Sequence, residues 1–157
     1  MKIFISHKQD DSFTANQIAN ELEICNVDYY LDVLDTSVIL NSRQLTNHIR
    51  SSLNECTDII VVMSSVTSLS QWVPFEVGMA AQVSMPTVTF LKENVSLPEF
   101  LADWPCLKKV TDIQKYVLTR KDVDREYRPI YEDAGYDDEI FRQKRVERFY
   151  DVLKQRL

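Results

Sequence analysis

Glycine is almost absent from this chain: the 157 residues include only Gly78 and Gly135. A GxGxxG dinucleotide loop or a P-loop needs several glycines within a few residues, so neither phosphate-binding loop can be built here. The GxSxG turn that carries the nucleophile of many serine hydrolases is missing as well. The commonest nucleotide-binding and hydrolase motifs of α/β proteins are therefore excluded.

Cysteine and histidine are also scarce. Cys25, Cys56 and Cys106 are odd in number and widely spaced, which predicts reduced thiols rather than a disulfide framework. The chain has two histidines, His7 and His48, and no Cys/His pair has the short spacing of a zinc site. We expect no metal and no bound cofactor.

Basic charge and long apolar runs are both limited. The chain has 18 Lys and Arg against 24 Asp and Glu, a net charge of −6, which argues against a nucleic-acid partner. The longest apolar run, Ile59 to Met63, is too short to span a bilayer, and Met1 and Lys2 lead directly into a strand pattern without a secretory signal. We expect a soluble, cytoplasmic protein with no membrane partner.

The sequence does contain an alternation of short apolar runs and amphipathic segments. Strands are predicted at residues 2–6, 27–31, 59–63 and 86–91, with a weaker fifth candidate at 107–110. Helices are predicted at residues 13–24, 45–56 and 72–81, the first with Phe13 on its apolar stripe. Three strand–helix repeats in succession predict an α/β fold with a parallel sheet covered on both faces.

Charge is distributed unevenly along the chain. Residues 1–110 hold 7 Lys and Arg against 13 Asp and Glu, whereas residues 111–157 hold 11 of each. Residues 120–139 are charged and tyrosine-rich without a dominant period. A terminal helical stripe contains Val146, Phe149, Tyr150, Leu153 and Leu157. We expect a single domain over 1–157, with a core at 1–110 and a C-terminal helical segment that docks on the sheet or on a partner chain.

One acidic residue, Glu76, stands among apolar neighbours in the helix that follows the third strand. Ser68 and Ser70 are candidate N-caps for this helix, and Pro74 is tolerated within its first turn. In a continuous helix from Trp72 onward, Trp72 and Glu76 lie on one face. Glu76 is then either a first-turn glutamate that stabilises the helix through its favourable interaction with the helix dipole, or a functional carboxylate.

Response-regulator receivers have a similar length and a similar order of strands and helices. They resemble this chain in the acidic pair Asp10 and Asp11 after the first strand. Their phosphoacceptor aspartate belongs at the end of the third strand, where this chain has Met63, Ser64 and Ser65. A receiver is therefore excluded, and we interpret the two aspartates as helix caps.

Four short motifs, in order, are similar to those of the Toll/interleukin-1 receptor (TIR) domain. They read IFISHKQDD, YYLD, IIVVMS and S-x-W-x-x-x-E-x-G-x-A, the last from Ser70 to Ala80, and together they cover residues 2 to about 92. The chain resembles bacterial TIR domain proteins, in particular the standalone TIR enzymes of Thoeris-type anti-phage defence. The resemblance implies a flavodoxin-like three-layer fold with a five-stranded parallel sheet, plus a C-terminal helical extension.

The same resemblance implies an enzyme that cleaves NAD between nicotinamide and ribose and makes a signalling nucleotide derived from ADP-ribose. NAD is then a substrate, the TIR domains self-associate, and the diffusible nucleotide reaches an effector protein. Glu76 matches the catalytic glutamate of the family. The implied substrate-binding residues are Ser6, His7, Lys8, Asp32, Ser64 and Trp72.

The loop at residues 33–44 departs from the family pattern, because Asn41 and Ser42 stand where many members have glycine. This loop often packs against a neighbouring subunit in the family, so the departure concerns assembly more than chemistry. Two alternative functions stay open. One is a non-catalytic TIR adaptor or scaffold. The other is a nucleoside deoxyribosyltransferase-like enzyme, which also uses a glutamate at a glycosidic carbon.

Overall fold

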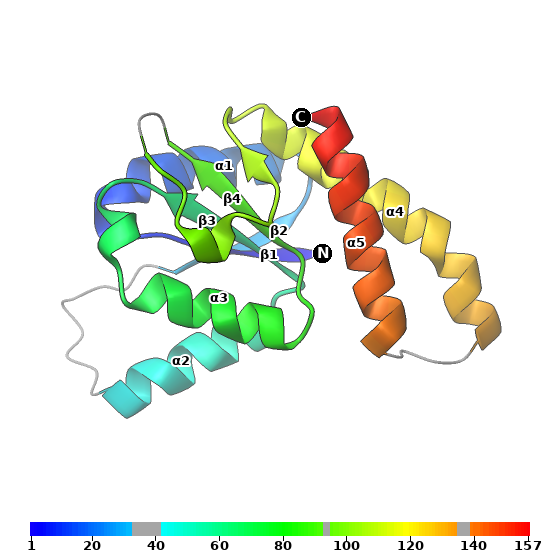
Figure 1. The fold of residues 1–157 in the computed structure, drawn as a ribbon, viewed down its shortest axis with the longest axis horizontal. Coiled ribbons are helices and arrows are strands. Elements are labelled where there is room, and N and C mark those ends of the chain that lie inside the picture. Colours follow the sequence, from blue (N-terminus) through cyan, green and yellow to red (C-terminus); the bar gives the residue numbers. More distant parts are fainter. Residues whose placement is uncertain (33–41, 93–94, 135–138) are drawn as a thin grey trace.

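Five parallel strands form one sheet in the computed structural model, which describes residues 1–32, 42–92, 95–134 and 139–157 (Figure 1). The strands are β1 (Lys2–Ser6), β2 (Asp28–Asp32), β3 (Asp58–Met63), β4 (Thr87–Leu91) and β5 (Cys106–Leu107). Their order in the sheet is β2-β1-β3-β4-β5, and every neighbouring pair is parallel. The predicted flavodoxin-like α/β fold is confirmed.

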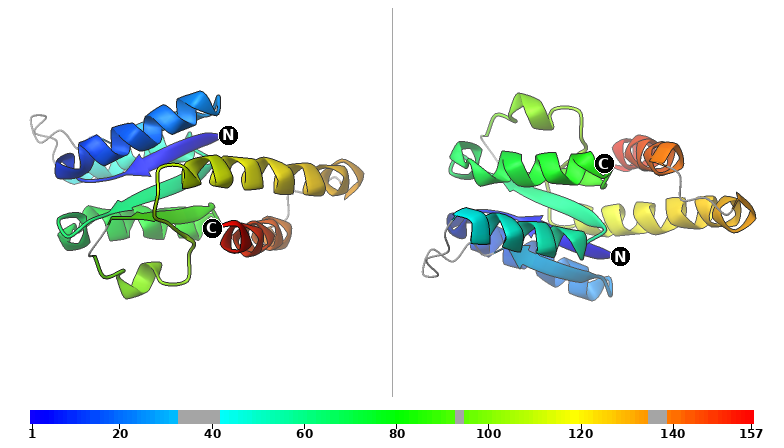
Figure 2. Two further views of the ribbon diagram at one scale, coloured as in Figure 1. Left: turned by 90° about the horizontal axis from the view of Figure 1, so that it is seen from above. Right: turned by 90° about the horizontal axis from the view of Figure 1, so that it is seen from below.

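Helices cover both faces of this sheet (Figure 2). The α-helices are α1 (Ser12–Ile24), α2 (Ser42–Asn54), α3 (Trp72–Gln82), α4 (Asp112–Ala134) and α5 (Glu139–Arg156), and the short 3-10 turns are η1 (Gln9–Asp11), η2 (Thr67–Leu69) and η3 (Glu99–Leu101). One core cluster packs α1, α4 and α5 on one face, and a second cluster packs α2 and α3 on the other. No helix in the described ranges is long and apolar enough to cross a bilayer.

The central strand β3 shows why the sheet needs this double cover. All six of its residues are buried. Ile60 and Val62 belong to the core cluster under α1, while Ile59 and Val61 belong to the one under α2 and α3. A strand that is apolar on both sides is stable only in a sheet with helices on both faces.

The predicted strand positions agree with the structure to within one residue for β1 to β4, and β5 is a two-residue strand rather than 107–110. The largest difference is at residues 120–139, where no period was found but α4 runs continuously to Ala134. Ion pairs one turn apart support this charged helix, for example Arg120 with Asp124. The assignment of Phe13 to the apolar stripe of α1 is wrong, because Phe13 is 76% exposed.

Helices α4 and α5 form an antiparallel pair that is tied to the sheet by a buried charge at the start of β3. The Asp58 carboxylate accepts hydrogen bonds from the Tyr116 hydroxyl at 2.6 Å and from Arg120 Nε at 2.8 Å. The Arg120 guanidinium also lies 5.6 Å from the ring centre of Phe149 in α5. The backbone N–H of Thr87 donates to the Tyr150 hydroxyl at 2.8 Å, which adds a second link between α5 and the sheet.

The charge of Arg120 is stabilised despite its burial. Desolvation lowers the pKa of Arg120, but Asp58, Tyr116 and Asp124 together raise it by more, and the net pKa lies above the ordinary value. Burial together with the Asp58 carboxylate raises the pKa of Tyr116 well above its ordinary value, so the tyrosine remains a hydrogen-bond donor. Asp58 and Arg120 therefore form a closed ion pair at neutral pH.

Replacing Asp58 by Asn should lower the free energy of unfolding by about 3 kcal/mol, because Arg120 loses its fully buried countercharge. Urea denaturation at neutral pH measures the change. Asp122→Asn is the matched control, since Asp122 pairs with Arg125 and Arg156 at the surface and its loss should cost less than about 1 kcal/mol. Equal losses in the two variants would show that burial adds nothing to the Asp58 pair.

Candidate functional site

The winding of the sheet reverses between β1 and β3, and in open parallel sheets ligands bind beyond the carboxyl ends of the strands at such a point. Ser6 ends β1, and Ser64 directly follows β3. The parallel register pairs Ser6 with Asp32 at the end of β2. Three predicted site residues thus meet at one edge of the sheet, although the side chain of Asp32 lies outside the described part of the chain. In Figure 1 this edge faces away from α4 and α5.

Local capping fixes where α3 begins. The N-cap residue is Gln71 rather than Ser68 or Ser70. The Ser70 hydroxyl, one position earlier, still accepts hydrogen bonds from the backbone N–H groups of Trp72 at 3.2 Å and Val73 at 3.4 Å. Pro74 lies in the first turn, where its missing N–H is tolerated. Glu76 falls in the second turn, so its interpretation as a first-turn glutamate on the helix dipole is wrong.

Glu76 is held against the end of β1. The Ser6 hydroxyl donates a hydrogen bond to Glu76 Oε2, and both residues are almost completely buried, Ser6 at 0% and Glu76 at 1% exposure. The side chain of Glu76 therefore points from α3 toward the strand ends. Trp72, one turn earlier, is half-buried against the second core cluster, and its ring meets Phe75 edge to face at 5.9 Å.

Asp11 is the centre of a second buried network at this edge. Its carboxylate accepts hydrogen bonds from Ser64 Oγ at 2.5 Å, Thr67 Oγ1 at 2.6 Å and Lys92 Nζ at 3.0 Å. Asp11 occupies the N-cap position of α1, as predicted, but its side chain makes no cap hydrogen bond to that helix. Ser64 in turn accepts from the backbone N–H of Thr67 at 3.1 Å. The network joins the loop after β1, the turn after β3 and the end of β4.

The pKa of Asp11 reflects these contacts. Burial raises it, but the hydrogen bonds from Ser64, Thr67 and Lys92 lower it by more, and the net pKa lies below the ordinary value. Asp11 is therefore an anion at neutral pH. Its neighbour Asp10 is exposed. The sequence contains no signal that distinguishes Asp11 from Asp10, because the difference depends only on the tertiary contacts of Asp11.

The remaining predicted site residues take different positions. His7 is buried, with 4% exposure, and its Nδ1 lies 3.2 Å from the Ile5 carbonyl oxygen. Lys8 is half-buried beside it. His48 lies on α2 with Nε2 2.9 Å from the Tyr30 hydroxyl oxygen. Only Ser6 and Glu76 among the predicted site residues are joined by a hydrogen bond that the structure describes.

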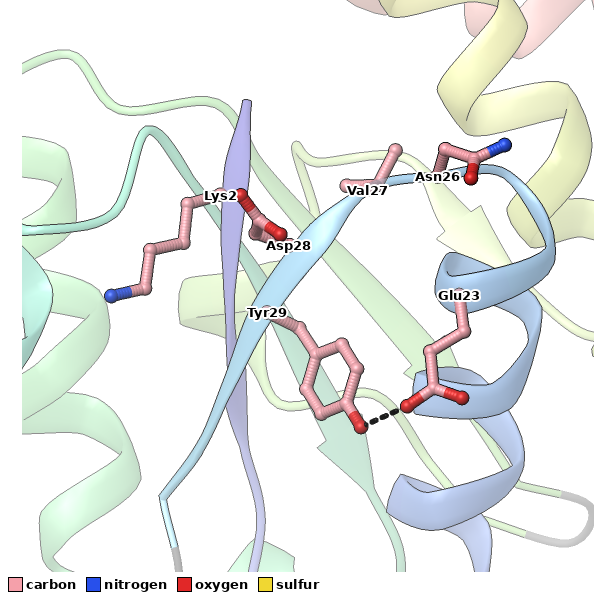
Figure 3. A pocket seen from close by; sticks show the side chains of 6 residues that line it. All are labelled: Lys2, Glu23, Asn26, Val27, Asp28 and Tyr29. Carbon is pink, nitrogen blue, oxygen red and sulfur yellow. Dashed lines mark hydrogen bonds between the residues drawn. The ribbon is translucent and has the colours of Figure 1, made fainter.

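None of the three cavities described in the structure is lined by Glu76. The largest, about 660 Å³, lies at the start of β1 and β2 (Figure 3), where the Tyr29 hydroxyl donates to Glu23 Oε1 at 2.6 Å. It is at the opposite edge of the sheet from Glu76. No cluster of three or more metal-ligating side chains occurs among the described residues.

The fold and this edge define a class of protein: a parallel α/β domain with strand order 2-1-3-4-5 and a buried carboxylate where the winding reverses. Residues 3–127 match the TIR domain family. The chain belongs to that family, and α5 lies beyond the matched residues.

A solved structure with this fold is that of a metazoan TIR-STING receptor from C. gigas. The TM-score is 0.56 and the sequence identity 22%, over 73% of this chain. The matched part spans 39% of the receptor chain, so the likeness concerns the fold of one portion of that protein. No curated protein matches the sequence.

The Asp11 network predicts a specific loss of stability in acid. Because the folded-state pKa of Asp11 is depressed, its contribution is complete above the unfolded pKa near 4 and is lost as pH falls through the lower folded pKa. Asp11→Asn should lower the free energy of unfolding by about 2 kcal/mol at neutral pH. This difference from the wild type should shrink toward pH 3. Urea denaturation across the pH range measures it, with exposed Asp10→Asn as the matched control; a difference independent of pH would contradict the assignment.

Proposed function

We propose that this TIR domain protein cleaves NAD at the bond between nicotinamide and ribose, with Glu76 as the catalytic residue. The observation that carries the proposal is the position of the Glu76 carboxylate, held by Ser6 at the carboxyl edge of the sheet where the winding reverses. The surrounding W-x-x-x-E motif is the one in which the TIR family resemblance places a catalytic glutamate. The position of the carboxylate and the motif around it thus both support Glu76 as the catalytic residue.

The chemistry suits a single carboxylate. Nicotinamide departs with the electron pair of the broken C–N bond and neutralises its own positive ring, so no general acid is needed. Positive charge then develops at the ribose carbon and ring oxygen, and a nearby anion stabilises it. A nucleophile completes the reaction by bonding to the ribose carbon and losing a proton. Water gives ADP-ribose, an internal ring nitrogen a cyclic isomer, and another acceptor a conjugate.

The structure supports a resting state for this enzyme. Glu76 is 1% exposed, and an anion that must approach a ribose has to exchange contact with Ser6 for contact with substrate. Substrate binding or self-association of TIR domains would supply the free energy for that exchange. His7, Lys8, Ser64 and Trp72 contribute to the proposed substrate site from the same edge, and Asp32 joins them through the end of β2.

We further propose that the product is a nucleotide signal for an effector protein, as in the standalone TIR enzymes of bacterial anti-phage defence that the chain resembles. This role places the reaction in the cytoplasm, which agrees with the three free cysteines. NAD enters as the substrate, and the proposal requires no cofactor.

A second candidate is a non-catalytic TIR scaffold. The specific observation in its favour is the burial of Glu76, which is 1% exposed and hydrogen-bonded to Ser6. A scaffold would assemble through TIR contacts and leave NAD intact under every condition. Sedimentation and NAD consumption, measured on the same samples, distinguish the two candidates.

The decisive change is Glu76→Gln, which keeps the shape of the side chain and removes its charge. Nicotinamide release should fall by about 10²-fold or more, because the anion that stabilises the ribose cation is lost. The measurement is mass spectrometry of nucleotides after incubation with NAD, with and without lysate from phage-infected cells as trigger. Glu55→Gln, a surface glutamate paired with Lys2, is the control and should retain full activity. Equal turnover by wild type and Glu76→Gln would remove the catalytic role.

A further inference from the structure

A groove of about 510 Å³ lies between α2 and α3, the two helices that cover one face of the sheet. Its apolar lining includes Leu53 of α2, Phe75 and Met79 of α3, and Val83 directly after α3. Phe75 and Val83 are exposed. A Cβ atom added to Gly78, which also lines the groove, would meet no atom within 4 Å. Within the described part of the chain, the α2–α3 groove is therefore an open apolar hollow.

The charge at the α2–α3 groove is positive. α2 contains Arg43 and Arg50 and no acidic residue, and the only charged residue of α3, Glu76, is buried. Arg50 lines the groove, and Arg43 lies two turns earlier on the same side of the helix. No ion pair between described residues includes either arginine. The groove thus combines apolar surface with uncompensated positive charge.

The opposite face of the domain carries an exposed apolar patch. Ile24 at the end of α1 is 68% exposed, and Leu118 of α4 is 57% exposed. Gln114, one turn before Leu118, donates to Glu21, which lies three residues before Ile24, at 2.9 Å. This contact between the two helices brings Ile24 and Leu118 close together. We refer to the two side chains as the Ile24–Leu118 patch.

Two carboxylates lie on either side of this patch. Glu21 accepts its hydrogen bond from a neutral amide, and Glu23 accepts one from the neutral Tyr29 hydroxyl at 2.6 Å. Lys121 of α4 also lies at this end of α1, where its ammonium group donates to the carbonyl oxygen of Cys25. Neither Glu21 nor Glu23 forms an ion pair with another residue that the structure describes, and α1 contains no basic residue. The patch is therefore acidic where the groove is basic.

The two surfaces lie on opposite faces of the sheet, as the two views of Figure 2 show for α1 and for α2 with α3. They also lie at the same edge of the sheet. Ile24 precedes the start of β2 by four residues, and Val83 precedes the start of β4 by four residues. A second copy stacked on the first can therefore place its patch over the groove without turning end over end.

Charge complementarity favours a second copy as the occupant of the groove. A partner surface needs an apolar centre to fill the hollow and acidic groups at its rim to meet Arg50. The Ile24–Leu118 patch, with Glu21 and Glu23 beside it, has this composition. Because the contact joins two different surfaces, each added copy presents a free groove and a free patch to the next.

We propose that this protein associates head to tail, with the Ile24–Leu118 patch of one copy packed in the α2–α3 groove of the next. Glu21 and Glu23 then pair with Arg50 across the contact. The association is independent of the proposed NAD cleavage, because it is defined by surfaces that do not include Glu76 and is measured without turnover.

Sedimentation velocity of the full chain, from micromolar to millimolar concentration, tests the proposal. The wild type should grow beyond a dimer as its concentration rises, and added salt should weaken the association because charges take part. Ile24→Lys sets a cation against Arg50 and should weaken the association by about tenfold or more. Leu69→Lys, at a similarly exposed position near the other edge of the sheet, is the matched control and should associate as the wild type does.

Charge reversal on each surface identifies the pairing and also controls for misfolding. Arg50→Glu makes the groove acidic, and Glu21→Lys with Glu23→Lys makes the patch basic, so each variant alone should remain monomeric. An equimolar mixture of the two should associate again, since every groove then meets a patch of opposite charge. A wild type that stays monomeric, an assembly that stops at a dimer, or a mixture that stays monomeric would overturn the proposal.

Discussion

Burial of β3 on both faces is the constraint from which the rest of the molecule follows. Its six residues leave no room for polar chemistry inside the sheet, apart from Asp58 at its first position. Polar and charged groups therefore gather where strands begin and where they end. The two edges carry separate polar networks. At the edge where the strands begin, Asp58 binds Arg120 of α4. At the edge where they end, the hydrogen bond between Ser64 and Asp11 connects the loops.

The two edges satisfy buried carboxylates in different ways. Asp58 is neutralised by the guanidinium of Arg120, a contact that fixes structure and leaves little capacity for a ligand. Glu76 accepts a hydrogen bond from the Ser6 hydroxyl. The Asp11 carboxylate has partners of both kinds: it accepts hydrogen bonds from two neutral hydroxyls and pairs with the half-exposed cation of Lys92.

Local sequence pattern was sufficient for the strands, because an apolar run between turn residues is nearly independent of the rest of the chain. It failed for α4, whose charged residues gain stability from pairs with α5 and from the packing of Tyr127 on Phe141. It also could not distinguish Asp11 from Asp10, or foresee that His7 turns inward, since both depend on contacts between distant segments. Glu76 was identified through its motif, and its hydrogen bond to Ser6 spans 70 residues.

The burial of Glu76 is compatible with the proposed reaction, and it explains how one carboxylate can be effective. In water, a carboxylate stabilises a neighbouring cation weakly, whereas in a site without water the same charge acts far more strongly. The cost is that a buried carboxylate is unfavourable without hydrogen bonds, and the Ser6 hydroxyl provides one here. When a ribose cation develops beside Glu76, a strong contact between opposite charges replaces the hydrogen bond from Ser6. The free energy gained by that replacement is largest in the transition state, where catalysis requires it.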